Sequence, residues 1–110
     1  MTYSESKERQ PDVMLQGKAK LINFNHVTLP RANENGEIET FWRCEQVRVS
    51  AYASRGEIIQ AVIRNKYSEP GEELALINNM LANPDDETAQ ANYAEYQLRR
   101  QQAKSVADSV

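Results

Sequence analysis

The segment 33–37 lies between two runs rich in β-branched and aromatic residues, and this arrangement constrains the fold more than any other feature of the sequence. Within it, Asn35-Gly36 is a strong short-range hairpin signal, because both residues tolerate positive φ angles. The run before the turn ends at Pro30, which cannot donate to a strand ladder. The run after it spans about residues 38–52. We therefore expect an antiparallel β-hairpin in the first half of the chain.

The apolar residues of the two runs give this hairpin an unusual pattern. With Asn35-Gly36 as a two-residue turn, the expected apolar pairs are Ile22–Val49, Phe24–Val47, Val27–Cys44 and Leu29–Trp42. A regular ribbon places the first two pairs on one face and the last two on the other, because side chains alternate along a strand. Either a bulge near residues 44–46 switches the face, or the half next to the turn covers a second surface, such as a partner.

Three helices are expected after the hairpin. Ser54-Arg55-Gly56-Glu57 has the form of a capping box and opens a helix over 55–66. A second helix over 72–82 ends before Asn83-Pro84, and a third runs from Asp85 or Asp86 almost to Val110. The fold class is therefore α+β, an N-terminal β-hairpin followed by three α-helices. The residues 13–19 offer a third strand.

The chain organisation is simple. A length of 110 residues suits one domain, which we place at residues 13–108, and the polar residues 1–12 are expected to form a flexible arm. No apolar run is long enough for a membrane span, and the N-terminus lacks the apolar centre of a signal peptide. A single cysteine suits a reducing compartment. We expect a cytoplasmic protein without a membrane partner, with association to a virion as the alternative.

Motifs that carry chemistry are nearly absent. Cys44 and His26 are the only cysteine and histidine, and a regular register separates them on opposite faces of the hairpin. A cysteine nucleophile needs a nearby base, so we expect a structural Cys44 and a surface His26. The four glycines form no phosphate-binding or dinucleotide-binding loop. We therefore expect no enzyme, no cofactor and no metal site.

The charges favour no nucleic-acid surface, although they leave it as the alternative. Residues 43–66 have a net charge of +3, whereas residues 67–95 contain seven acids and no Lys or Arg. The helix pair 55–66 and 72–82 invites comparison with a helix-turn-helix, yet its second helix would repel phosphate. A nucleic-acid-binding accessory protein would use a basic patch of Arg43, Arg48, Arg55, Arg64 and Lys66.

Apolar side chains left over by the hairpin and the third helix predict a protein interface. A regular register puts part of the hairpin's apolar set on the face opposite Phe24, and the third helix has a thin apolar face. Exposed aromatic patches commonly mark interfaces, and a symmetric dimer is the commonest way to cover one. The expected partner is a second copy, or a phage or host protein. The alternative is that the third helix covers Trp42 within one chain. The candidate interface residues are Val27, Leu29, Trp42, Tyr93 and Tyr96.

Four runs of residues, over about 60% of the chain, carry a resemblance to other proteins. They are residues 42–49, 55–68, 75–79 and 93–99. With them, residues 42–107 resemble small uncharacterised proteins of Bacteroides-type genomes, often encoded near prophage genes. The resemblance implies a lineage and carries no site residues. The expected function is thus a noncatalytic interaction or structural protein of phage or mobile-element origin.

Overall fold

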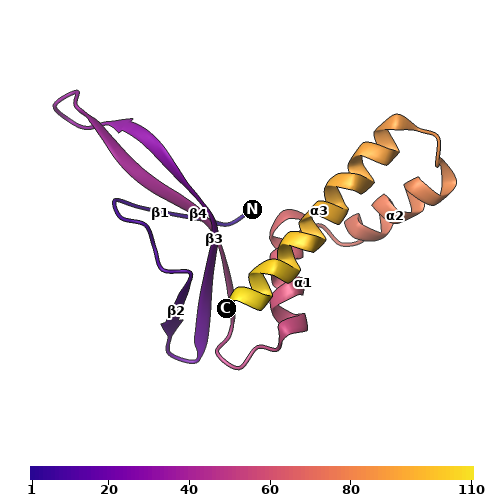
Figure 1. Cartoon of the computed structure of the whole chain (residues 1–110), viewed down its shortest axis with the longest axis horizontal. Helices are drawn as coiled ribbons and strands as arrows, with labels where there is room; N and C mark the ends of the chain where they lie inside the picture. Colours follow the sequence, from indigo (N-terminus) through magenta and orange to yellow (C-terminus); the bar gives the residue numbers. More distant parts are fainter. The chain divides into compact units, whose positions relative to one another are not determined.

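The structure, a computed structural model, describes residues 1–110 and divides into two compact units. The first, Met1–Ala53 with Val110, contains the strands, and the second, Ser54–Ser109, contains the helices (Figure 1). The expected α+β class, with the strands first and three helices after them, is confirmed. The sequence predicts a single domain over residues 13–108, whereas the structure separates the strands from the helices at residues 53 and 54.

The first unit is a four-stranded antiparallel sheet in the order β1-β4-β3-β2. The predicted hairpin is formed by the two long strands β3 and β4, and β2 supplies the third strand anticipated in residues 13–19. The strands are β1 (Tyr3–Ser6), β2 (Val13–Gln16), β3 (Ala19–Ala32) and β4 (Ile38–Ser50).

Strand β1 corrects the expectation of a flexible arm over residues 1–12. Tyr3–Ser6 pairs antiparallel with the β4 segment 42–45, and the Arg43 guanidinium lies 4.5 Å from the centre of the Tyr3 ring. An open strand edge offers unpaired backbone N–H and C=O groups, which any backbone can satisfy. A polar sequence can therefore add a strand, which apolar patterning does not reveal.

The turn between β3 and β4 is longer than predicted. Ala32 lies opposite Ile38, so five residues separate the last pair of the ladder. The Asn33 side-chain oxygen accepts hydrogen bonds from the backbone N–H groups of Asn35 and Glu37, both at 2.9 Å. This side chain stabilises the loop. The Gly36 N–H donates a hydrogen bond to the Asn33 carbonyl and closes a turn, and Gly36 itself has a φ of 78°. The two-residue turn, and the four apolar pairs built on it, are therefore wrong.

A β-bulge interrupts the long hairpin. Phe24 lies opposite Glu45 and Val27 opposite Arg43, so two β3 residues, 25 and 26, oppose the single residue Cys44. Of the two alternatives read from the sequence, the bulge is the one observed, with its extra residue on β3. Arg43 and Glu45 are two apart on β4 and share a face. The β3 side chains on that face, which we call the apolar face, are Ile22, Phe24, Val27 and Leu29.

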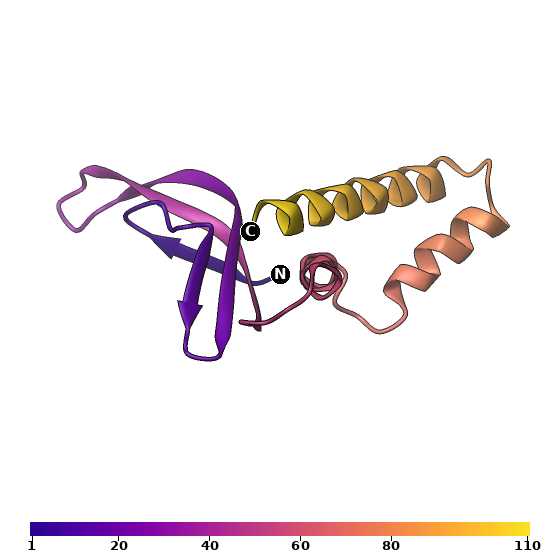
Figure 2. The same ribbon diagram turned by 60° about the horizontal axis from the view of Figure 1, so that its bottom comes forward.

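The second unit contains α1 (Arg55–Lys66), α2 (Glu72–Ala82) and α3 (Glu87–Ser109), close to the predicted bounds. The expected cap is present, because the Ser54 hydroxyl accepts a hydrogen bond from the Glu57 N–H at 3.2 Å. Helix α3 packs against both α1 and α2 (Figure 2). The long third helix thus organises the unit.

The interior of the helical unit combines small and large side chains. Val62 on α1 and Ala103 on α3 are fully buried. Arg99 is also buried, and its Nε and Nη2 donate to the Val62 carbonyl oxygen at 3.0 and 2.8 Å. Tyr96 stacks edge-on against Tyr67, with ring centres 5.3 Å apart. These contacts join α1 to α3.

Candidate functional site

The end of the β3–β4 hairpin extends beyond the other strands of the sheet. Strand β2 pairs with β3 only as far as Ile22, and β1 pairs with β4 only between Glu45 and Trp42. The ribbon from Val27 to Phe41, which we call the hairpin arm, reaches past β2, and from the Leu29–Phe41 pair onward it also reaches past β1 (Figure 1). A two-stranded hairpin is marginally stable in water by itself, so an arm of this kind gains stability when another surface covers it.

The apolar face of the hairpin arm combines aliphatic, aromatic and arginine side chains. Val27 is 45% exposed, and Leu29 and its partner Phe41 are half-buried. The Arg31 guanidinium lies 5.3 Å from the centre of the Phe41 ring and also pairs with Glu5. Aromatic and arginine side chains are enriched at the centres of protein interfaces, because they bury large areas and still form polar contacts.

The structure brings only part of the predicted interface together. Val27 and Leu29 share the apolar face, but Trp42 lies opposite Thr28 and points to the other face of β4. The bulge is the cause, because it moves the β3 residues nearest the turn onto the face of Phe24. The expected grouping of Trp42 with Val27 and Leu29 is therefore wrong.

The two tyrosines of α3 are not an exposed pair. Tyr96 is only 4% exposed, and its hydroxyl donates to the Glu73 carboxylate at 2.7 Å. Tyr93 is half-buried, with its ring centre 6.5 Å from that of Tyr96. Tyr96 therefore belongs to the interior of the helical unit, where its hydroxyl has a partner, and its assignment to an interface is corrected.

The predicted basic patch is also divided. On β4, Arg43 and Arg48 are an odd number of positions apart and so point to opposite faces of the sheet. On α1, Arg55 pairs with Asp108 at 2.6 Å and Lys66 pairs with Glu95. The hydrogen bond and charge of Arg55 hold the pKa of Asp108 below its ordinary value.

The remaining cation of the patch, Arg64, is exposed and nine residues from Arg55. At 3.6 residues per turn, this spacing puts it on the opposite side of α1. Neither unit therefore presents the five cations as one surface.

Cys44 and His26 both contact the connection between β1 and β2. The Cys44 thiol lies 3.8 Å from the Ser4 carbonyl oxygen and 3.9 Å from Gln10 Oε1, and His26 Nε2 lies 3.0 Å from Asp12 Oδ1. His26 Nδ1 is buried without a hydrogen-bond partner, so neither ring nitrogen bonds the thiol. The His26 side chain is 9% exposed, which corrects the expectation of a surface residue.

The protonation of Cys44 follows from its surroundings. Burial raises the pKa of the thiol, and this effect exceeds the opposing effects of the Ser4 carbonyl contact and the Arg9 charge. The thiolate is the nucleophilic form, and it is scarce at neutral pH in such a site. The geometry therefore gives Cys44 neither a bonded base nor a stabilised thiolate.

Asn23 fastens the β1–β2 connection to the sheet, a role that the sequence did not indicate. Its Nδ2 donates to the Pro11 carbonyl at 2.8 Å, and its Oδ1 accepts from Gln46 Nε2 at 2.9 Å. The Asn23 backbone N–H also donates to the Asp12 carbonyl at 2.8 Å. Asn23 is 2% exposed, and an asparagine between the apolar residues Ile22 and Phe24 is the sequence signal that could have marked it.

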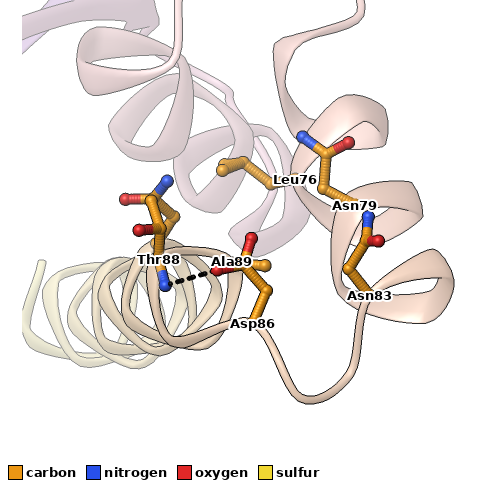
Figure 3. Close-up of a pocket in the computed structure, with 7 residues that line it drawn as sticks. Leu76, Asn79, Asn83, Asp86, Thr88 and Ala89 are labelled. Atoms are coloured by element: carbon orange, nitrogen blue, oxygen red, sulfur yellow. Dashed lines mark hydrogen bonds between the residues drawn. The ribbon is translucent and has the colours of Figure 1, made fainter.

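A polar pocket of about 270 Å³ lies where α2 ends and α3 begins (Figure 3). The Asp86 carboxylate accepts a hydrogen bond from the Thr88 N–H at 3.1 Å and so caps α3. The other polar lining side chains are three amides and the Thr88 hydroxyl, which donate and accept hydrogen bonds but do not act as bases near neutral pH. The lining residues are Leu76, Asn79, Asn83, Asp86, Thr88, Ala89 and Asn92.

No three His, Cys, Asp or Glu side chains lie together in a way that could hold a metal ion. None of the three helices combines the length and the apolarity that a membrane crossing requires. No protein-family model, no curated protein and no solved structure matches this chain.

Proposed function

We propose that this chain is a noncatalytic interaction protein that self-associates through the apolar face of its hairpin arm. The observation that carries the proposal is the composition of this face. Val27 is 45% exposed beside Leu29 and Phe41, and Arg31 lies over the aromatic ring. Contact with a second surface would remove these apolar side chains from water.

The order of side chains along the arm favours a second copy as the partner. Leu29 pairs with Phe41 at the middle of the arm. On the same face of β4, Arg43 lies two residues from Phe41 toward the base of the hairpin, and Glu39 lies two residues toward its tip. When two arms pack face to face about a two-fold axis at the middle pair, their strands run in opposite senses. Arg43 of each copy then meets Glu39 of the other, so the face is self-complementary.

The wider role follows the resemblance of residues 42–107. From it we infer a phage or mobile-element origin, with a second copy or a phage or host protein as the partner. The alternative of nucleic-acid binding has less support, because the cations of its patch lie on separate faces. The arm itself carries Arg31 against three glutamates, a net charge that repels phosphate. These glutamates are Glu34, Glu37 and Glu39.

The test is the molar mass of the full chain in solution, measured by sedimentation over a range of micromolar concentrations. Two strands offer a small surface, so we expect a dimer with a Kd on the order of micromolar or weaker. Arg43→Glu and Glu39→Arg should each weaken the dimer at least about tenfold, and the double variant should restore it. Arg48→Glu, on the other face of β4, is the matched control and should leave the dimer intact.

Either of two results would overturn the proposal. One is a wild-type chain that stays monomeric at the highest concentration. The other is a dimer that the charge reversals at Arg43 and Glu39 do not weaken. Circular dichroism of each variant separates a lost interface from a lost fold, because the helices and strands remain in the first case only.

A further inference from the structure

Helix α2 leaves an apolar stripe exposed on the helical unit. None of its residues is buried, and Leu74 and Leu81 are 61% and 76% exposed. They are seven residues apart, so they lie about 10 Å apart on one side of the helix, with the half-buried Ile77 between them. We call Leu74, Ile77 and Leu81 the leucine stripe. Glu73, the residue before Leu74, is not part of this stripe: its carboxylate accepts a hydrogen bond from the Tyr96 hydroxyl of α3.

The charged residues of the segment that contains the leucine stripe all have one sign. Residues 67–95 contain seven carboxylates and no Lys or Arg. Three of these acids lie at the start of α2 or just before it, and three lie between the end of α2 and the start of α3. Both ends of the stripe are therefore negative, which attracts cations and repels anions. The six acids are Glu69, Glu72, Glu73, Asp85, Asp86 and Glu87.

We propose that the leucine stripe docks a cationic amphipathic helix of a partner protein. Two turns of exposed apolar side chains match one face of a helix with apolar residues at i, i+3 and i+7, the common mode of helix docking. The carboxylates at both ends select a partner with Lys or Arg about one turn beyond its apolar residues. An acidic helix, nucleic acid or an anionic lipid surface meets repulsion at the same place.

This surface goes beyond the proposed self-association, because it belongs to the helical unit and uses none of the residues of the hairpin arm. Peptide binding can therefore be absent while the dimer persists, and the dimer can be absent while peptide binding persists. Since no α2 residue is buried, substitutions in the stripe should leave the helices folded.

The probe is a fluorescein-labelled peptide of leucine and lysine with its leucines at helical spacing, titrated with the full chain and followed by anisotropy. The comparison peptide has the same composition in scrambled order, so it keeps the charge but loses the apolar face. The double variant Leu74→Ser, Leu81→Ser removes the stripe. The matched control is Leu98→Ser, which removes a leucine that is 66% exposed on α3. The variant Glu69→Gln, Asp85→Asn removes one charge at each end.

We expect the wild-type chain and Leu98→Ser to bind the ordered peptide equally and at least about tenfold more tightly than the scrambled one. The stripe variant should lose at least about tenfold in affinity, and the charge variant should lose several-fold at low salt and less at high salt. Equal binding of the two peptides, or full binding by the stripe variant, would overturn the proposal. Binding that the charge variant does not weaken would overturn the cationic assignment.

Discussion

Phe24 and Val27 lie on the same face of β3, although three positions separate them and a regular strand would place them on opposite faces. The bulge opposite Cys44 is the reason. It joins the buried residues Ile22 and Phe24 to the exposed Val27 and the half-buried Leu29 in one continuous apolar face. The self-association surface depends on this single inserted residue.

The bulge predicts an unusual preference at Asn25, whose φ is 55°. Both Asn25→Gly and Asn25→Ala lose the hydrogen bond from Asn25 Nδ2 to Glu45. The difference between their free energies of unfolding therefore reports the cost of the positive φ at this position. Glycine adopts positive φ without a steric cost, whereas alanine does not, so the glycine variant should be more stable by about 1 kcal/mol. Chemical denaturation measures the difference. Ala91→Gly in α3 is the control and should lose about 1 kcal/mol; equal stability of the two Asn25 variants would contradict the bulge geometry.

The turn makes a similar prediction at Gly36, whose φ is 78° and whose added Cβ would meet no atom within 4 Å. The cost of Gly36→Ala therefore comes from the backbone alone, and we expect a loss of about 1 kcal/mol. Gly56→Ala, in the first turn of α1, should leave stability unchanged or raise it, because alanine favours helix. A neutral Gly36→Ala, measured by the same denaturation, would show that the turn takes another form.

Asn23 should control access to Cys44. Asn23→Ala removes the hydrogen bonds of a buried amide and leaves the Pro11 carbonyl and the Gln46 amide without this partner, so we expect the free energy of unfolding to fall by about 2 kcal/mol. Opening of the β1–β2 connection should then speed modification of Cys44 by a thiol reagent at pH 8 at least several-fold. Asn92→Ala, at an exposed position, should change neither quantity. A wild-type Cys44 that already reacts like a free thiol would contradict its burial.

Tyr96 should make the helical unit sensitive to high pH. Burial, and then the hydrogen bond to Glu73, raise the pKa of Tyr96 from an ordinary 10 to about 12. The folded chain therefore holds this proton more tightly than the unfolded chain. The stabilisation of the fold by the protonated Tyr96 is complete below about pH 10 and is lost as the pH rises through the range from about 10 to about 12.

Tyr96→Phe isolates this effect. At pH 7 the variant should be less stable by about 1–2 kcal/mol, because it lacks the bond to the Glu73 carboxylate. Phenylalanine has no proton to lose, so the difference in free energy of unfolding between the variant and the wild type should narrow or reverse at pH 11. Denaturation curves at both pH values measure it, and a gap that stays constant would show that Tyr96 does not titrate as described.

The sequence located the elements better than their register. The helices were recoverable because Ser54, Asn83-Pro84 and the acids at helix starts mark their ends locally. The register was not, because the Asn33 side chain stabilises a longer turn than Asn35-Gly36 alone would form. Strand β1 escaped detection because its contribution is backbone pairing, which polar side chains do not reveal.

The candidate site was recovered in part for the same reason. Val27 and Leu29 were named because a regular register places them on the face opposite Phe24. The bulge instead puts them on the face of Phe24, where Val27 is still exposed. Trp42 and Tyr96 were misplaced because exposure depends on contacts distant in sequence. The bulge moves Val27 to the face opposite Trp42, and Tyr67 and Glu73 contact the ring and hydroxyl of Tyr96.

The most direct measurement of the central claim is cross-linking at the middle of the hairpin arm. In a Cys44→Ala background, Leu29→Cys puts a thiol on the apolar face beside the proposed two-fold axis, and Thr28→Cys puts one on the opposite face of the same strand. Oxidation at micromolar concentration should link Leu29→Cys into a covalent dimer and leave Thr28→Cys largely monomeric. Equal cross-linking of the two variants, or none in either, would contradict self-association through this face.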